Sequence, residues 1–130
     1  KDRAGIKLKN DLSEAHRDIK NINMNAPRQF HGRSKEGRIV ELFGDSTAFD
    51  FSPYRGKMDL VFIDANHSYF YVKVDTQNAF KMLSPQGIIL WHDYDFIHPG
   101  VFRAVNEIAR AKQGFYIERK RFAIFLNTNV

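Results

Sequence analysis

The segment Asp59-Leu-Val-Phe-Ile-Asp64 is a short apolar run that ends on an aspartate. The segments Arg38-Ile-Val-Glu-Leu-Phe-Gly-Asp45 and Gly87-Ile-Ile-Leu-Trp-His-Asp93 have the same form. Short runs of branched and aromatic residues, followed by turn or helix residues, are typical of buried parallel strands. Because ligands of open α/β sheets bind beyond the carboxyl ends of the strands, the three aspartates predict a site at one edge of one sheet.

Helices are predicted between and after these strands. The residues at positions 72, 76, 79, 80 and 83 fall on one helical face, and Pro99-Gly100 opens a second helix with an apolar stripe. Residues 115–118 and 122–126 are expected to form an antiparallel pair. The resulting order of strand, turn, strand, helix, strand, helix, strand, strand predicts an α/β fold with a mostly parallel sheet and a C-terminal antiparallel pair.

Charge and composition exclude several classes of protein. The net charge of +5 comes from residues 1–38, which contain Phe30 but no cluster of aromatic side chains for nucleic-acid stacking. We therefore expect a solvated basic segment and no nucleic-acid partner, with a weak attraction for an anionic ligand left open. The chain has no cysteine, no visible signal peptide and no apolar stretch of the roughly 20 residues that span a membrane. The expected location is cytoplasmic, away from membranes.

Three motifs together resemble one enzyme family. They are Gly44-Asp45-Ser46, the run from Asp59 to Asp64 with its continuation Ala-Asn-His67-Ser-Tyr69, and Leu83-Ser-Pro-Gln-Gly87-Ile-Ile-Leu-Trp-His-Asp93. They resemble class I S-adenosylmethionine-dependent methyltransferases, in particular small-molecule O-methyltransferases with a Phe-Ile-Asp-x-x-His-Ser-Tyr signature. The resemblance covers approximately residues 38–127. It implies a Rossmann-like sheet whose last strand is antiparallel.

The same resemblance implies features that are not recognisable in this chain. The family's glycine-rich loop follows its first strand, but the eight glycines of the sequence include no Gly-x-Gly. We therefore expect residues 38–130 to be the C-terminal part of a methyltransferase domain, and residues 1–37 to be a basic loop and helix segment that acts as a flap or linker. We therefore expect this chain to be a C-terminal fragment of a longer protein, or the ordered or processed part of one. A homo-oligomer that supplies the missing strands is the alternative.

Two strand-end aspartates are candidate metal ligands. Adjacent parallel strands lie about 4.8 Å apart, so Asp64 and Asp93 can converge, and two close carboxylates need a cation or a shared proton. Oxygen ligands favour Mg²⁺ or another hard divalent cation. The resemblance implies the same use of these acids, with His92 or Asp95 as a third ligand. The alternative is structural: Asp64 would cap the next helix, and Asp93 would bind loop amides.

His67 is the candidate general base. Methyl transfer to a hydroxyl requires that the hydroxyl lose its proton, and histidine side chains ordinarily titrate near neutrality. The position of His67 after a strand end and the family resemblance both favour this role, with Asp64 beside it in the catalytic site. The alternative is a histidine that caps the following helix or packs under Tyr69.

Further residues are expected around the cofactor and the acceptor. The resemblance implies that Asp45 and Ser46 contact the adenine of S-adenosylmethionine, and Asp64 is a further cofactor-binding candidate. Tyr69, Trp91 and Tyr94 are candidates for the wall of the substrate pocket, although a strand-end aromatic such as Trp91 is more often plain core. The basic run at residues 119–121 is expected to be a solvated hairpin tip that protects the sheet edge.

The leading functional hypothesis is transfer of a methyl group from S-adenosylmethionine to a hydroxyl of a small polar acceptor, with a divalent metal as an optional aid. Two alternatives remain open. One is a non-catalytic module that keeps the fold and acts in binding or assembly. The other is a metal-dependent α/β hydrolase that would use Asp64 and Asp93.

Overall fold

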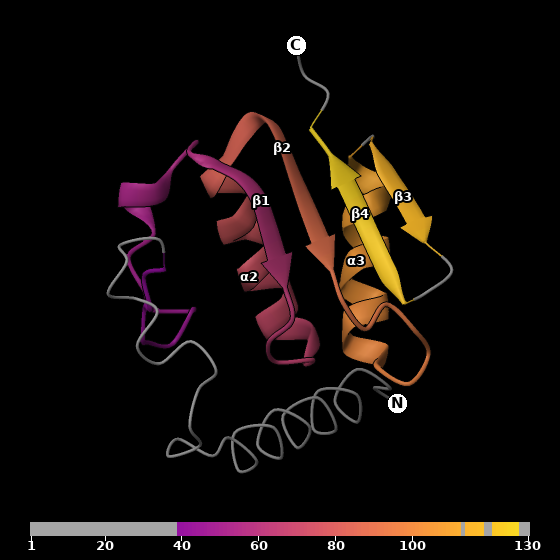
Figure 1. Ribbon diagram of the computed structural model, residues 1–130. Coiled ribbons are helices and arrows are strands. Elements are labelled where there is room, and N and C mark those ends of the chain that lie inside the picture. The colour runs from indigo at the N-terminus through magenta and orange to yellow at the C-terminus, as the bar shows by residue number, and fades with distance from the viewer. Residues whose placement is uncertain (1–38, 113, 119–120, 128–130) are drawn as a thin grey trace.

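A mixed sheet forms the centre of the described part of the chain. The computed structural model describes residues 39–112, 114–118 and 121–127, so the segment predicted as a flap or linker (1–37) lies outside it. The elements are a 3₁₀ helix η2 (Ser52–Tyr54), β1 (Met58–Ile63), α2 (Tyr69–Met82), β2 (Leu83–Trp91), α3 (Pro99–Ala111), β3 (Phe115–Glu118) and β4 (Phe122–Leu126). Figure 1 shows these elements along the chain.

The strand pairing confirms the predicted α/β class. The sheet order is β1-β2-β4-β3, in which β1 and β2 are parallel and joined through α2, while β4 is antiparallel to both β2 and β3. The predicted parallel unit and the C-terminal antiparallel pair are both present. Within the described residues one of the three strand pairings is parallel, so this part of the sheet is mixed. This arrangement agrees with part of a Rossmann-like methyltransferase sheet.

The prediction of a strand in the first apolar run is wrong for residues 39–43, which form no strand. A strand needs a neighbour for its backbone donors and acceptors, and in the described chain β1 pairs with β2 alone. The side chains of Val40, Leu42 and Phe43 are exposed instead of packed. An apolar composition therefore favours a strand at these residues, but a strand forms only where a neighbouring strand is available for pairing.

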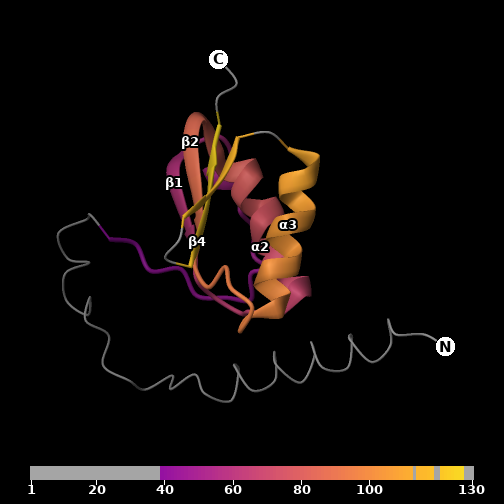
Figure 2. The same ribbon diagram turned by 90° about the vertical axis from the view of Figure 1, so that its right-hand side faces the viewer.

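Two helices cover one face of the sheet, and Figure 2 shows both α2 and α3 on the same side of the strands. The core between them takes Ile89, Trp91, Ala123 and Phe125 from the strands, and it takes small or branched side chains from the helices (Val72, Ala79, Val101, Ala104 and Val105). The indole Nε1 of Trp91 donates to Thr76 Oγ1 at 2.9 Å, and that hydroxyl donates to the carbonyl oxygen of Val72. The buried polar groups of this core are therefore paired with each other.

Gly100 allows α3 to begin directly against the loop that follows β1. A Cβ at this position would overlap the carbonyl oxygen of His67 and the backbone nitrogen of Tyr69. We therefore expect Gly100→Ala to destabilise the fold by about 1–3 kcal/mol through overpacking. Helix propensity alone would favour alanine by about 1 kcal/mol, so the sign of the change is informative. Urea unfolding measures it, and equal or greater stability of the variant would contradict the close approach.

Candidate active site

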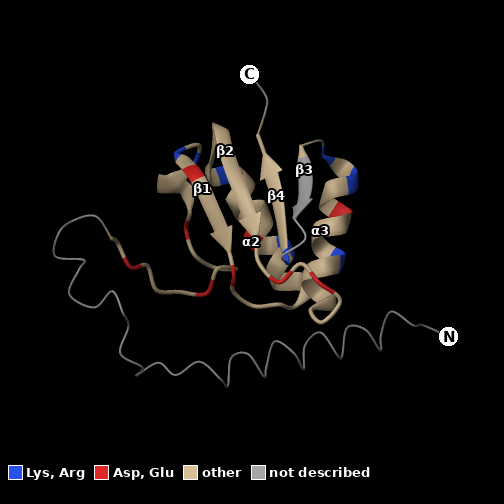
Figure 3. Ribbon diagram, turned by 45° about the vertical axis from the view of Figure 1, so that its right-hand side comes forward, with Lys and Arg blue, Asp and Glu red and all other residues tan. Residues whose placement is uncertain are grey.

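Two loops meet at the edge of the sheet where β1 and β2 end. Residues Ile63 and Trp91 are paired at the ends of these parallel strands, and His92 N donates to the Ile63 carbonyl oxygen at 3.0 Å. Asp64 and His67 follow β1, and Asp93 and His98 follow β2. Both strands point toward the same edge in Figure 1, and Figure 3 shows acidic positions on both loops. The prediction that Asp64 and Asp93 converge is confirmed, because their donor atoms lie within 4.8 Å of each other, but Asp45 is not a third strand-end aspartate, since it follows no strand.

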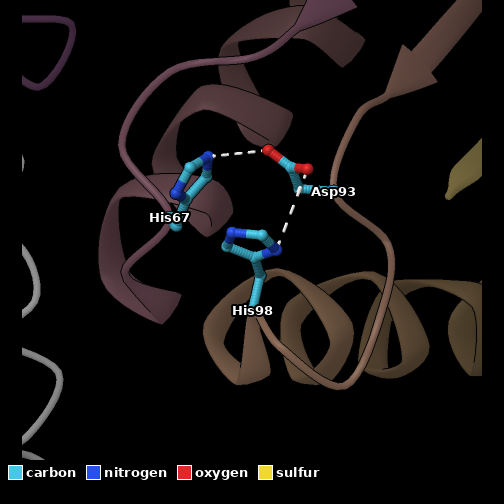
Figure 4. Close-up of side chains that lie close together, drawn as sticks. All are labelled: His67, Asp93 and His98. Carbon is cyan, nitrogen blue, oxygen red and sulfur yellow. Dashed lines mark ion pairs between the residues drawn. The ribbon is translucent and has the colours of Figure 1, made fainter.

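The carboxylate of Asp93 is the centre of this site. It is 6% exposed, and its backbone has a φ of 56°, a left-handed conformation that aspartate adopts more readily than most residues. Asp93 Oδ2 lies 3.0 Å from His67 Nε2 and 3.1 Å from His92 Nδ1, and Asp93 Oδ1 lies 3.8 Å from His98 Nδ1. Figure 4 shows the His67 and His98 rings next to each other, with their centroids 4.5 Å apart and Asp93 facing both. One buried acid therefore organises three imidazoles.

His92 carries a buried nitrogen that lacks a well-formed hydrogen bond. Its Nδ1 lies near Asp93 Oδ2 and 3.4 Å from Asp64 Oδ1, but among the described residues no partner meets hydrogen-bond geometry. One donor atom from each of Asp64, His92 and Asp93 lies within 4.8 Å of the others. A second group with this property consists of His67, Asp93 and His98. Mixed imidazole and carboxylate donors of this kind suit a divalent cation.

Arg121 corrects the prediction of a solvated hairpin tip. Its guanidinium donates from Nη2 to Asp93 Oδ1 and from Nε to Asp95 Oδ2. Asp95 Oδ1 in turn accepts the backbone N–H groups of Ile97 and His98, and it lies 2.9 Å from His98 Nδ1. The prediction is wrong for Arg121 because the local sequence of a hairpin tip does not show which loop packs against it. The placement of Arg119 and Lys120 lies outside the described residues.

The pKa of Asp95 reports this contact. Burial raises the pKa of Asp95, but hydrogen bonds from His98 and Arg121 outweigh it and lower the pKa from 3.8 to about 2. The lowered pKa stabilises the fold above the unfolded value of about 3.9, and that contribution is lost as the pH falls through 2.

We expect Arg121→Gln to raise the pKa of Asp95 part of the way toward 3.8, because the contacts with His98 remain. The stability that Asp95 contributes then becomes smaller, and its loss on acidification is complete at a higher pH. A carboxyl ¹³C NMR titration measures the pKa. An identical Asp95 titration in Arg121→Gln and wild type would contradict the contact.

The Gly44-Asp45-Ser46 turn lies beside an apolar hollow. The carboxylate of Asp45 accepts both the backbone N–H and the hydroxyl of Thr47, and the backbone hydrogen bond is the main reason that its pKa is lowered. The hollow has a volume of about 90 Å³ and is lined by Leu42, Gly44, Ser46, Phe49 and Phe51. Gly44 lets the Phe49 ring approach closely, since a Cβ there would lie 3.0 Å from it.

Two side chains of α2 hold this turn in place. Asn78 Nδ2 donates to the Ser46 carbonyl oxygen at 3.1 Å. Asp75 lies close enough that burial, with a smaller contribution from the charge of Asp45, raises its pKa against a hydrogen bond from Ser46. Sequence reasoning did not select Asp75 or Asn78, because both appear as polar positions on an amphipathic helix.

The three predicted pocket aromatics point in different directions. The Tyr69 hydroxyl donates to Glu107 on α3, and its ring lies under the Arg103 guanidinium. Trp91 is fully buried and adjoins a cavity of only about 10 Å³ that His67 also lines. Tyr94 stacks on Phe102 with 5.1 Å between ring centroids. The structure thus places these rings mainly in packing contacts, and their role toward an acceptor stays a prediction.

His98, Asp95 and Arg121 were not among the residues selected for the site. The sequence indicates Asp95 only as the alternative to His92 for a third metal ligand, and His98 stands in an apparent loop before Pro99. The signal that might have found His98 is its position at the start of α3, which returns the chain to the edge where β2 ends. No local signal identifies Arg121, because its contacts lie 26 and 28 residues away along the chain.

Comparisons with known proteins give one match. A family model described as a methyltransferase domain matches residues 9–94, which include part of the N-terminal segment, the turn at residues 44–46 and both strand-end loops as far as Tyr94. No curated protein and no solved structure gives a significant match to the chain. Across the described residues, helices that are both long and apolar enough to cross a membrane are absent.

Proposed function

This chain belongs to the methyltransferase-domain family of class I S-adenosylmethionine-dependent methyltransferases, and from that membership we propose that it methylates a hydroxyl of a small polar acceptor. The observation that supports oxygen as the acceptor atom is the pairing of His67 Nε2 with Asp93 Oδ2 at 3.0 Å. An imidazole beside a buried carboxylate suits the removal of a hydroxyl proton.

Each residue of the pair has a distinct task in this proposal. S-adenosylmethionine supplies a methyl group on a positively charged sulfur. As the acceptor oxygen bonds to the methyl carbon and the carbon–sulfur bond breaks, the hydroxyl proton passes to the His67 imidazole. Asp93 holds the tautomer with its proton on Nε2, whose lone pair is on Nδ1, and then stabilises the imidazolium cation that forms. The rest of the rate enhancement comes from alignment of oxygen, carbon and sulfur.

The turn at residues 44–46 is the proposed adenine contact. Its hollow is lined by apolar and aromatic side chains, and this composition fits a flat purine ring with polar edges. Ser46 lines the hollow, Asp45 precedes it in the same turn, and Asp64 directly follows β1. We assign these three residues to cofactor binding on that basis.

A divalent cation is the proposed aid to the reaction. The Nδ1 atom of His92 lies near the carboxylates of Asp64 and Asp93 but forms no hydrogen bond with either. A metal ion bound by all three side chains would give this nitrogen a partner. Arg121 pairs with Asp93 and Asp95, while Asp64 adds a further carboxylate beside Asp93, and this excess of negative charge favours a doubly charged ion. Bound there, the ion would lower the pKa of the acceptor hydroxyl.

The test of the methyl-transfer proposal has two stages, both with the full-length natural protein. Calorimetry with S-adenosylhomocysteine should show binding that weakens when Asp45 is changed to alanine. A screen of small hydroxyl compounds with isotopically labelled S-adenosylmethionine should then yield an O-methylated product. Absence of cofactor binding would refute the proposal in favour of a binding or assembly module, and N-methylation alone would refute the hydroxyl acceptor.

The metal proposal has its own measurement. Titration with Mn²⁺, followed by electron paramagnetic resonance, should show a site that is lost in His92→Ala. Asp59→Asn should retain it, because Asp59 lies near the start of β1, at the opposite end of the strand from Asp64. Equal Mn²⁺ binding in wild type and His92→Ala would contradict the assignment of His92.

A further inference from the structure

Arg121 links the C-terminal hairpin to the loop that follows β2. Its guanidinium bridges the carboxylates of Asp93 and Asp95, and its carbonyl oxygen accepts the backbone N–H of Tyr94 at 3.0 Å. The Arg121 backbone has a φ of 70°, a conformation uncommon for a residue with a Cβ. A side-chain bridge and a backbone hydrogen bond therefore attach the turn between β3 and β4 to the site.

The contact with Arg121 divides the two oxygens of Asp93 between different partners. Oδ1 accepts from Arg121, while Oδ2 faces His67 Nε2 and His92 Nδ1. A carboxylate is planar, so fixing Oδ1 also fixes the direction in which Oδ2 points. The side chain of Asp93 is 9% exposed, so little solvent competes with Arg121 for Oδ1.

We infer that Arg121 is a positioning residue for the proposed reaction: it holds Asp93 in the orientation that keeps the His67 imidazole aimed and in one tautomer. This inference rests on the proposed role of His67 as the base. Arg121 acts through Asp93 and does not need to touch the acceptor. The turn of the C-terminal hairpin therefore contributes to a site that is otherwise built from the loops after β1 and β2.

The shape of arginine accounts for its use at this position. The planar guanidinium presents Nε and Nη2 in a fixed geometry, which matches two carboxylates at once. A lysine ammonium is a single point charge on a flexible stem. We therefore expect Arg121→Lys to restore part of what Arg121→Gln removes, and Asp95→Asn to weaken the arrangement by removing one of the two anchors.

The first measurement does not depend on activity. In uniformly ¹⁵N-labelled full-length protein, long-range ¹H–¹⁵N spectra at fixed pH report which ring nitrogen of His67 carries the proton. We expect one dominant tautomer, protonated at Nε2, in wild type and in Arg110→Gln, a matched change at an exposed arginine of α3. We expect mixed tautomers in Arg121→Gln. An unchanged His67 spectrum in Arg121→Gln would overturn the inference, and Asp95→Asn supplies the same test if Arg121→Gln does not fold.

The second measurement is kinetic and uses the acceptor found in the screen. Arg121→Gln should lower kcat by about 10- to 100-fold, since small displacements of a catalytic group have effects of that size. The affinity for S-adenosylhomocysteine should not change. In an Asp93→Asn background, Arg121→Gln should have little further effect, because it acts through Asp93. A further loss as large as in wild type would overturn the inference. Altered tautomers with an unchanged rate would instead refute His67 as the base.

Discussion

We expect His67→Ala to lower the rate of the proposed methyl transfer by about 10²- to 10⁴-fold, the usual contribution of a general base. The expected loss is in kcat, because His67 faces Asp93 at the edge of the sheet and lies away from the hollow beside the turn at residues 44–46. The affinity for S-adenosylhomocysteine should stay within a factor of a few. Steady-state kinetics and calorimetry of the full-length protein measure the two quantities.

The controls for this prediction separate chemistry from folding. His67→Gln retains a polar side chain of similar length but cannot act as a base near neutral pH, so it should lose as much rate as His67→Ala. His16→Ala removes an imidazole that has no assigned role, and its rate should equal that of wild type. A rate within twofold of wild type in both His67 variants would show that another group takes the proton.

Trp91→Ala has the largest effect expected on stability. Trp91 is 0% exposed between the sheet and both helices, and truncation of a buried large aromatic costs about 3–5 kcal/mol. Since domains of this kind are stable by only about 5–15 kcal/mol, the variant should be close to unfolding at room temperature. The free energy of unfolding, from urea titration followed by circular dichroism, is the quantity to compare.

The hydrogen bond of Trp91 can be tested separately from its packing. Thr76→Val removes the acceptor of the indole N–H and leaves a buried donor unpaired, at a cost of about 1–3 kcal/mol. Thr76→Ser retains the hydroxyl and should cost less. Phe96→Ala, at a ring that is 85% exposed, should change stability by less than about 0.5 kcal/mol. Equal losses in Thr76→Val and Thr76→Ser would show that the hydrogen bond contributes little.

The sequence predicts the location of the candidate site, because both the fold class and the edge at which ligands bind can be inferred from local sequence patterns. Apolar runs of strand length alternate with a helical pattern, and this alternation predicts parallel strands whose ends share one edge. That rule predicts Asp64 and Asp93, and together with the family resemblance it predicts His67. The structure brings donor atoms of Asp64 and Asp93 into one group and places His67 against Asp93. Their chemical roles remain predictions.

The same reasoning failed where the outcome depends on a distant partner. Residues 39–43 have a strand-like composition, but no described strand pairs with them. The sequence also did not indicate the hydrogen-bond partner of the Tyr69 hydroxyl, which is Glu107, 38 residues away; the role of Tyr69 in an acceptor pocket remains a prediction. The direction of a side chain at the start of a helix depends on which other helix packs beside it, and this cannot be predicted from composition.

The sequence by itself determined the order of the elements from β1 onward and the edge at which the candidate site lies, because periods of two and 3.6 residues are local properties of a chain. Only the tertiary structure decided how the site is assembled. The left-handed backbone of Asp93 and the hairpin turn at Arg121 bring a carboxylate and a guanidinium together across 28 residues, and Gly100 lets α3 lie against His67. These contacts depend on loop dihedral angles and close packing, which arise only when the elements meet.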